Sequence, residues 1–167
     1  MAMSPADRFR RIIVEIRQEL SNLARLHAEW QGIDPETGSH TIILRGEGSI
    51  FHDFYCGAER IFRAIADEVN GGVPAGESWH RLLLQDMRLE IPGLRPAVIS
   101  QATHEVLVDF LNFRHKFRNI YGFDLEPERV DEVEREFPEA HKQLVADLEV
   151  FLQFLENMAT SGTSSGT

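Results

Sequence analysis

The sequence predicts an all-α protein, an antiparallel bundle of about five helices. Apolar residues recur every three or four positions through four long segments, which is the spacing of helices that bury one face. Nowhere do apolar and polar side chains alternate over a short run between turn signals, so we expect no strand. A chain of 167 residues, 43% of them hydrophobic, can bury one core, and we expect a single domain over residues 1–159.

The first helix is expected from Pro5 to Trp30. Ser4 suits an N-cap, and proline is favoured at the first helical position. The turn that follows spans residues 32–38 and contains the helix breaker Asp34-Pro35. The predicted inward face consists of Phe9, Ile12, Ile13, Ile16, Leu20, Leu23, Leu26 and Trp30.

A second helix is expected to start near Ser39 or His40 and to end at Asn70-Gly71-Gly72, because glycine is favoured directly after a helix. A shorter third helix fits Glu77 to Arg88, and Ile91-Pro92-Gly93 breaks the pattern beyond it. The core face of the second helix would consist of Ile43, Ile50, Phe51, Phe54, Ala58, Ile61, Phe62, Ile65 and Val69.

The fourth helix is expected to open at Pro96 and to run from Ala97 to Tyr121. Gly122 stands where a left-handed residue commonly ends a helix. The predicted apolar face of this helix consists of Val106, Leu107, Phe110, Leu111, Phe113, Phe117 and Ile120.

Two further helical segments complete the predicted bundle. Residues 126–139 are acidic and fit a short solvated helix over Val130 and Val133, which we prefer to a functional acidic patch. A last helix follows Pro138. Residues 160–167 contain only Ser, Gly and Thr and suit a flexible tail.

Charge and cysteine content limit the kind of protein this is. Lys and Arg number 17 against 27 Asp and Glu, and the net charge of −10 argues against wholesale binding of duplex nucleic acid, so that any nucleic-acid site must be local. The single cysteine, Cys56, cannot form an internal disulfide, and residues 1–11 hold no apolar leader, so we expect a cytoplasmic protein. No run approaches the roughly 18 apolar residues of a membrane span, and we expect no membrane partner.

Five polar residues gather at the end of the fourth helix. With Arg114 set at 0° and about 100° added per residue, Arg118 falls at about 40° and Tyr121 at about −20°, inside the predicted apolar arc. His115 and Asn119, at about 100° and 140°, flank the two arginines at the edge of that arc. A guanidinium, an imidazole and an amide are the groups needed to hold and cleave a phosphodiester.

A structural interpretation of the two arginines stays open at this point. Arginine is almost never buried without a partner. The aliphatic stems of Arg114 and Arg118 would then pack along a helix contact while their head groups pair with acids such as Glu59 or Asp109. Helical geometry alone does not separate this interpretation from a functional site, and the mixture of three polar residue types favours the site.

The end of the fourth helix resembles a family signature. Residues 113–122, followed by Asp124-Leu125, are similar to the motif of the HEPN superfamily, in particular of HepT-like toxins from prokaryotic toxin–antitoxin pairs. That motif has Arg, a polar residue that is often Asn, three variable residues, His, one variable residue and Tyr. Here His115 stands where the family often has Asn, and Asn119 stands where it has the catalytic His. The general resemblance covers residues 5–158 and includes His52-Asp53-Phe54-Tyr55, Trp79-His80 and Arg95-Pro96.

The resemblance implies a helical-bundle endoribonuclease that needs no metal and no cofactor. Its RNA substrate would bind at a cleft between the motif helices of a homodimer. In that arrangement Arg114 and Arg118 stabilise the charge on the phosphorane, His115 transfers a proton and Asn119 orients the phosphate. The products would carry a 2′,3′-cyclic phosphate.

The resemblance also implies a partner, a minimal nucleotidyltransferase that acts as the antitoxin and in some pairs adds AMP to the tyrosine of the motif. Tyr121 occupies that position. Without the resemblance, Tyr121 is interpreted as a half-buried aromatic residue that finishes the helix. Because His115 and Asn119 are exchanged relative to the motif, a catalytically inactive HEPN-type module that binds a nucleotide or a partner remains the alternative function.

Other groups that carry chemistry are given structural interpretations. Glu77 and His80 have the Glu-x-x-His spacing of di-iron bundles, but the motif occurs once, so we expect no metal and place Glu77 in a first helical turn. Cys56 has no obvious basic neighbour in the sequence and is expected to be a buried, inert thiol. His52 and Asp53 lie beside the predicted core face of the second helix, where they would either contact the fourth helix behind the site or face solvent, and we expect the solvent position. The remaining histidines expected at the surface are His27, His40, His104 and His141.

Overall fold

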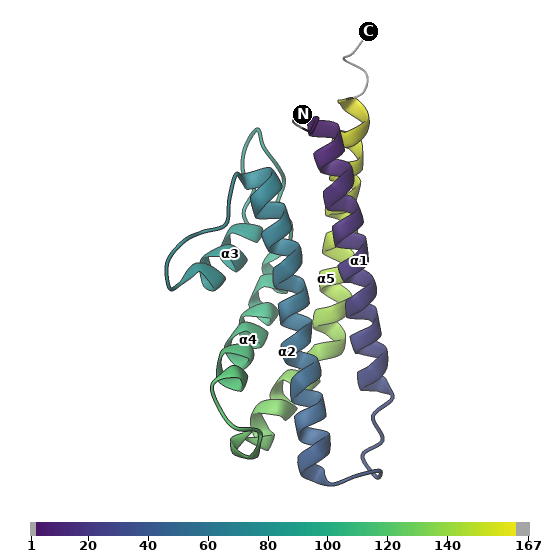
Figure 1. Cartoon of the computed structure of the whole chain (residues 1–167), viewed down its shortest axis with the longest axis vertical. Helices are drawn as coiled ribbons and strands as arrows, with labels where there is room; N and C mark the ends of the chain where they lie inside the picture. The colour runs from purple at the N-terminus through teal and green to yellow at the C-terminus, as the bar shows by residue number, and fades with distance from the viewer. Residues whose placement is uncertain (1–2, 163–167) are drawn as a thin grey trace.

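A computed structural model describes residues 3–162 as five α-helices packed into a bundle (Figure 1). This confirms the predicted fold class. Within these residues there is no strand, only an isolated bridge between Ile91 and Arg95, and no helix is both long and apolar enough to cross a membrane. The elements are α1 (Pro5–Gln31), α2 (His40–Ile65), the π-helical turn η1 (Ala66–Asn70), α3 (Trp79–Met87), α4 (Gln101–Arg118), the 3₁₀ turn η2 (Gly122–Asp124) and α5 (Pro127–Ser161).

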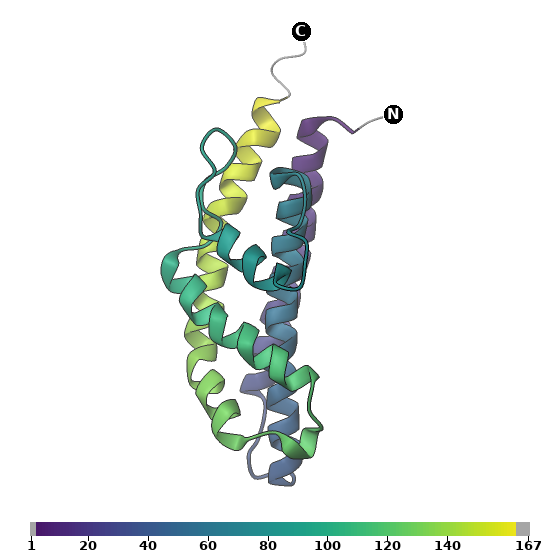
Figure 2. The same cartoon turned by 90° about the vertical axis from the view of Figure 1, so that its left-hand side faces the viewer.

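Three long helices form the body of the bundle, and α1 runs opposite to both α2 and α5 (Figure 1). The shorter helices α3 and α4 lie together on one side, and α4 crosses obliquely over α2 and α5 (Figure 2). The core at this crossing is aromatic, with Phe51 and Phe54 of α2, Phe110 of α4 and Phe137 of α5 in mutual ring contact. These contacts fix α4 to the body of the bundle.

The two N-terminal helices begin and end where the sequence predicts. The side chain of Ser4 accepts a hydrogen bond from the backbone N–H of Asp7, and the side chain of Ser39 accepts one from Ile42. Both serines therefore cap a helix start. α2 continues into η1, which ends at Gly71 with φ of 87°, a conformation that favours glycine.

The C-terminal segment differs from the prediction of two helices, because Pro138 lies inside the single helix α5. Proline removes one intrahelical hydrogen bond and disfavours a helix interior by about 3 kcal/mol. Buried apolar residues continue on both sides of it, from Val130, Val133 and Phe137 to Leu144 and beyond. Burial of this unbroken stripe offsets the proline. Residues 163–167, where most of the predicted tail falls, lie outside the described residues.

α4 begins later than predicted, at Gln101, because the segment before it is pinned to α3. The backbone N–H groups of Val98 and Ile99 donate to the carbonyl of Met87. Ser100 then caps the helix. The carboxylate of Asp147 in α5 accepts hydrogen bonds from the backbone N–H of Ser100 at 2.8 Å and from the hydroxyl of Thr103 at 2.6 Å.

α4 also ends earlier than predicted, at Arg118, so Tyr121 lies outside it. Gly122 is not left-handed and instead begins η2. A Cβ at Gly122 would lie 2.6 Å from Nε of Arg45 in α2. A side chain at this position would therefore meet the exposed Arg45 guanidinium, and the glycine does not serve as a helix-ending left-handed residue.

Gly57 of α2 offers a sensitive test of how closely α1 and α2 pack. A Cβ added at this position would lie 2.6 Å from Cδ2 of Leu23, which is fully buried in α1. We expect Gly57→Ala to destabilise the protein by about 1–2 kcal/mol, because the overpacking exceeds the gain in helix propensity. Urea unfolding would measure the change in free energy.

Gly46 is the matched control in the same helix. Nothing lies within 4 Å of a Cβ built there, so Gly46→Ala should stabilise the protein by about 0.5–1 kcal/mol. Equal effects of the two substitutions would contradict the close approach of α1 and α2.

Two of the histidines expected at the surface, His27 and His141, stack on each other between α1 and α5, with ring centroids 4.7 Å apart. Both are half-buried, and Phe137 lies against them. Burial, with a further contribution from the neighbouring His27, lowers the pKa of His141 from its ordinary value of 6.5. His104 is also half-buried, and burial lowers its pKa too. His40 alone of the four is exposed.

The lowered pKa of His141 predicts acid sensitivity. The folded protein favours the neutral imidazole, so this contribution to stability is complete above the unfolded pKa of 6.5 and is lost as the pH falls below it. Urea unfolding at about pH 7.5 and about pH 5.5 should show a smaller stability difference in His141→Phe than in the wild type. His40→Ala should leave the difference unchanged, and an unchanged difference in His141→Phe would refute the assignment.

Candidate functional site

A surface cleft of about 570 Å³ opens between the start of α3 and the second half of α4. It brings together four of the five residues that the sequence analysis singled out, and Tyr121 is not among its lining residues. The cleft also contains residues from the start of α3, which no pattern in the sequence connects with the arginines. Its lining consists of Glu77, Ser78, His80, Arg81, Leu111, Asn112, Arg114, His115, Arg118 and Asn119.

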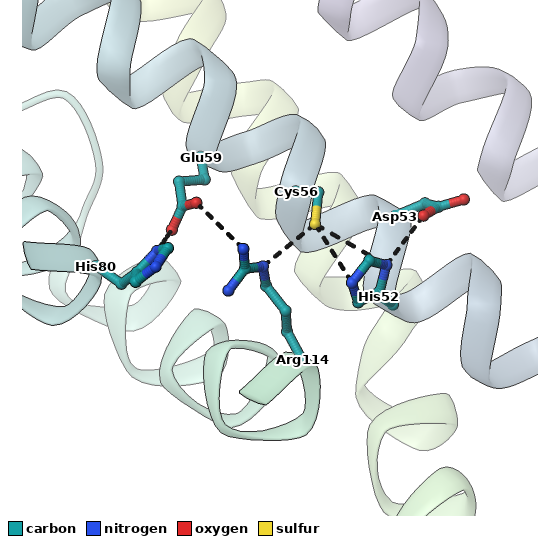
Figure 3. A network of polar contacts seen from close by, with 6 residues as sticks. All are labelled: His52, Asp53, Cys56, Glu59, His80 and Arg114. Carbon is teal, nitrogen blue, oxygen red and sulfur yellow. Dashed lines mark hydrogen bonds and ion pairs between the residues drawn. The ribbon is translucent and has the colours of Figure 1, made fainter. Parts of the chain in front are cut away.

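Arg114 is buried, and it reaches from α4 to α2 (Figure 3). Its Nε donates a hydrogen bond to Sγ of Cys56 at 3.3 Å, and its Nη2 lies 3.9 Å from Oε1 of Glu59. The pairing with Glu59 that helix geometry left open is therefore present, although the ion pair is loose. Arg114 combines a structural contact on one side with a place in the cleft wall on the other.

Arg118 differs from Arg114, because it is exposed and its guanidinium has no partner among residues 3–162. Its angular position predicted a place inside the apolar arc, but α4 ends at this residue and the side chain is exposed. His115 is exposed as well. Nδ2 of Asn119, the C-cap residue directly after α4, donates to the backbone carbonyl of His115 at 2.6 Å. The mouth of the cleft thus holds a free guanidinium and a free imidazole.

Tyr121 is neither half-buried nor helical. Its side chain is 71% exposed and stacks on Phe123, with ring centroids 5.1 Å apart and ring planes at 9°. The stacking fixes the ring while solvent reaches it. The residue therefore lies on an open surface just beyond the end of α4.

A chain of polar contacts continues behind Arg114 along α2 and α3 (Figure 3). Oε2 of Glu59 lies 2.6 Å from Nδ1 of His80. On the other side, the ring nitrogens of His52 lie 3.7 and 3.9 Å from Sγ of Cys56, and Nδ1 of His52 lies 3.0 Å from Oδ1 of Asp53. One network therefore joins three helices at the cleft.

This network corrects two expectations from the sequence. Cys56 is half-buried and does have a basic neighbour, Arg114, which comes from another helix. His52 does not simply face solvent, since it is half-buried and its ring packs on Phe117 of α4 with centroids 5.3 Å apart. The signal in the sequence was the spacing of His52, Cys56 and Glu59, which places the three side chains along one face of α2.

One protein-family model matches this chain. The sequence model of a family described as HepT-like protein matches residues 48–155, more than half of the chain. The chain belongs to the HepT-like family. The match confirms the predicted membership of a HEPN-type toxin family, and its span runs from α2 through most of α5 and contains the whole cleft. Curated proteins and solved structures gave no match.

The cleft of this HepT-like protein is locally cationic even though the chain is acidic. Arg81, Arg114 and Arg118 line it, and among its lining residues only Glu77 carries a carboxylate. Behind the wall, the ring of Tyr55 is fully buried, and its hydroxyl has no hydrogen-bond partner in the described part of the chain. Burial together with the Glu59 carboxylate raises the pKa of this hydroxyl. The three arginines allow the cleft to hold an anion. A local cationic site of this kind is what a chain with a net negative charge needs to bind nucleic acid.

A second hollow of about 510 Å³ lies between α4 and the start of α5. The side chains of Phe113, Phe117 and Leu125 line it, and so does Lys116. Five carboxylates also line it, from Asp109, Asp124, Glu126, Glu132 and Glu136, against the two cations Lys116 and Arg129. Its charge makes it the poorer site for a phosphate, and Lys116 serves below as a control outside the cationic cleft.

The geometry of the HepT-like protein does not assemble the Glu-x-x-His pair into a metal site. Glu77 precedes the N-cap Ser78 of α3 and so lies outside the first helical turn where it was expected, and His80 is bound to Glu59. Across residues 3–162, no group of three or more His, Cys, Asp or Glu side chains is placed to hold a metal ion.

Proposed function

We propose that this HepT-like protein is an endoribonuclease toxin that cleaves RNA without a metal ion and that a nucleotidyltransferase antitoxin neutralises it. The observation that carries the proposal is the cleft, in which the free guanidinium of Arg118 and the free imidazole of His115 lie beside Arg114. A phosphodiester carries one negative charge and needs proton transfer at two oxygens. In the cleft, the arginines can bind the negative charge and the imidazole can transfer a proton.

In this mechanism the 2′-hydroxyl of the RNA attacks the adjacent phosphorus. Arg118 binds the phosphate, and Arg114 at the cleft wall helps to stabilise the negative charge that grows on the phosphorane. His115 transfers a proton at one of the two reacting oxygens. Asn119 uses one amide N–H on the carbonyl of His115, which leaves the second N–H for a phosphate oxygen.

We also propose that the active form is a homodimer in which the ends of two α4 helices face each other. Ile120, Tyr121 and Phe123 are large apolar residues exposed just beyond α4, next to Arg118. A second protomer laid against Ile120 and Phe123 would cover these side chains and close the cleft around the RNA, with the Tyr121 hydroxyl left accessible at its edge. Light scattering at several protein concentrations would measure the molar mass.

The test of the function uses the purified full chain with single-stranded RNA and excess chelator. We expect cleavage that leaves a 2′,3′-cyclic phosphate and a 5′-hydroxyl, and no cleavage of the same sequence as DNA, because DNA lacks the attacking 2′-hydroxyl. Gel analysis with end-group chemistry distinguishes these products. RNA that is bound but uncut would instead support the inactive partner-binding module, and cleavage only with added metal would refute the mechanism.

The proposed antitoxin acts on Tyr121. Tyr121 is exposed and follows Arg118, which lines the cationic cleft, by three positions, and an AMP group added to it would compete with RNA for that arginine if its phosphate reaches the cleft. We expect the intact mass of the protein to rise by whole AMP units when it is co-expressed with a nucleotidyltransferase encoded beside it. Tyr121→Phe should abolish the increase, whereas an increase that persists in this variant would place the modification elsewhere.

A further inference from the structure

We propose that His80 is a second catalytic imidazole of the cleft and that Glu59 is its positioning residue. The proposal rests on the ribonuclease function proposed above and adds to it the group that accepts a proton from the RNA. Neither residue lies in the motif on α4, since His80 belongs to α3 and Glu59 belongs to α2.

The contact with Glu59 determines which nitrogen of His80 is available. Nδ1 lies 2.6 Å from Oε2 of a glutamate that is only 6% exposed. An ionised carboxylate can only accept hydrogen bonds, so Nδ1 of His80 carries the proton and donates it. In the neutral ring, Nε2 then has a free lone pair. This nitrogen has no hydrogen-bond partner within residues 3–162 and can accept a proton from a substrate in the cleft.

The ring of His80 is also held in its plane. It stacks on the indole of Trp79 with centroids 3.6 Å apart and an angle of 29°. Arg63 of α2 lies over the same indole, at 5.5 Å from its centroid. A base that is fixed by a hydrogen bond and a stacking contact loses little freedom when substrate binds, which favours catalysis.

Glu59 is placed to support this imidazole as it gains charge. Its Oε2 contacts His80, whereas its Oε1 faces Arg114 at the longer distance of 3.9 Å. A buried carboxylate that is only loosely paired retains negative charge to stabilise an imidazolium. The arrangement of carboxylate, imidazole Nδ1 and free Nε2 is the one by which an acid orients a catalytic histidine.

His115 differs from His80, because it is exposed and no side chain within residues 3–162 orients it. Two imidazoles in one cleft allow the two proton transfers to be divided. As the 2′-oxygen bonds to phosphorus, its proton passes to Nε2 of His80. The bond from phosphorus to the 5′-oxygen breaks, and that oxygen takes a proton from the imidazolium form of His115. Exchange with water then returns both rings to their starting states, so no net proton is consumed.

The first test compares the wild type with His80→Ala and His80→Asn in the chelator-containing RNA assay. Asparagine can keep an N–H directed at Glu59 but cannot take up a proton, so it separates chemistry from packing. We expect both variants to lower kcat by about 10²–10⁴-fold, with little change in KM. Added imidazole should restore part of the activity of His80→Ala. Wild-type cleavage by His80→Asn would overturn the proposal.

A second test addresses Glu59 as the positioning residue. Glu59→Gln keeps a carbonyl oxygen for Nδ1 of His80 but removes the negative charge that supports the imidazolium. We expect kcat to fall while KM stays near its wild-type value, and imidazole should not restore activity, since the His80 ring is still present. An unchanged kcat would overturn the role of Glu59.

The tests distinguish a failure of the proposed ribonuclease function from a failure of the proposed role of His80. If the wild type does not cleave RNA, the proposed function fails. If the wild type cleaves and the His80 variants cleave equally well, the function stands and the inference about His80 fails. His40→Ala, an exposed histidine at the start of α2, is the matched control and should retain wild-type kcat.

Discussion

His115→Ala is expected to lower kcat for RNA cleavage by about 10²–10⁴-fold and to leave the stability of the fold unchanged. The side chain is exposed and has no hydrogen bond or ion pair with another side chain among the described residues, so its removal costs the fold little. Its loss removes one proton-transfer group from the cleft. Single-turnover cleavage rates, measured beside the thermal unfolding midpoint, would separate these two effects.

The neighbouring residue Lys116 provides the control for His115. It is also exposed on α4, but it lines the acidic hollow and not the cationic cleft. Lys116→Ala should therefore cleave RNA within about threefold of the wild type, since a surface charge outside a site contributes little. If His115→Ala and Lys116→Ala cleave at the same rate, the imidazole of His115 has no part in the chemistry.

The fold was largely predictable because its signals are local. Ser4 and Ser39 cap the first two helices where the sequence indicates, and Gly71 ends η1 with a positive φ. Each of these is a short-range interaction between a side chain and the nearby backbone. Periodic apolar residues then indicate which face of each helix is buried, and the fully buried Phe51 and Phe54 follow that rule.

The predictions that failed depended on contacts between distant segments. Pro138 carries a strong local stop signal, but the buried face of α5 continues through it. Gly122 carries the signal of a left-handed helix end, whereas in the structure it has no positive φ and begins η2. Local propensity is a weak guide where tertiary packing opposes it.

The candidate site also has one part that the sequence predicts and one part that depends on contacts between distant segments. Arg114, His115, Arg118 and Asn119 could be grouped from the sequence because one helix carries them all. The contribution of His80 could not, since the hydrogen bond that orients it joins residues 21 positions apart. The angular position of a residue around its own helix shows which side chains of that helix share a face. It does not show how α3 packs against α2 and α4.

Arg114→Ala is expected to reduce both stability and cleavage, in contrast to His115→Ala. The guanidinium is buried and is the cation nearest to Glu59, so its removal leaves a buried carboxylate supported by His80 alone. We expect a loss of about 2–3 kcal/mol in the free energy of unfolding, which is at the lower end for a broken buried pair because the pair is loose. Urea unfolding at neutral pH would measure it.

Two further variants separate charge from packing in this effect. Glu59→Gln in the Arg114→Ala background should recover part of the lost stability, because the unpaired buried charge is then absent. Arg118→Ala should change stability by less than about 0.5 kcal/mol, since the side chain is exposed and unpaired, and yet weaken RNA cleavage. If Arg114→Ala and Arg118→Ala prove equally stable, the contacts of Arg114 with Glu59 and Cys56 do not stabilise the bundle. The network in Figure 3 would then not determine the shape of the cleft.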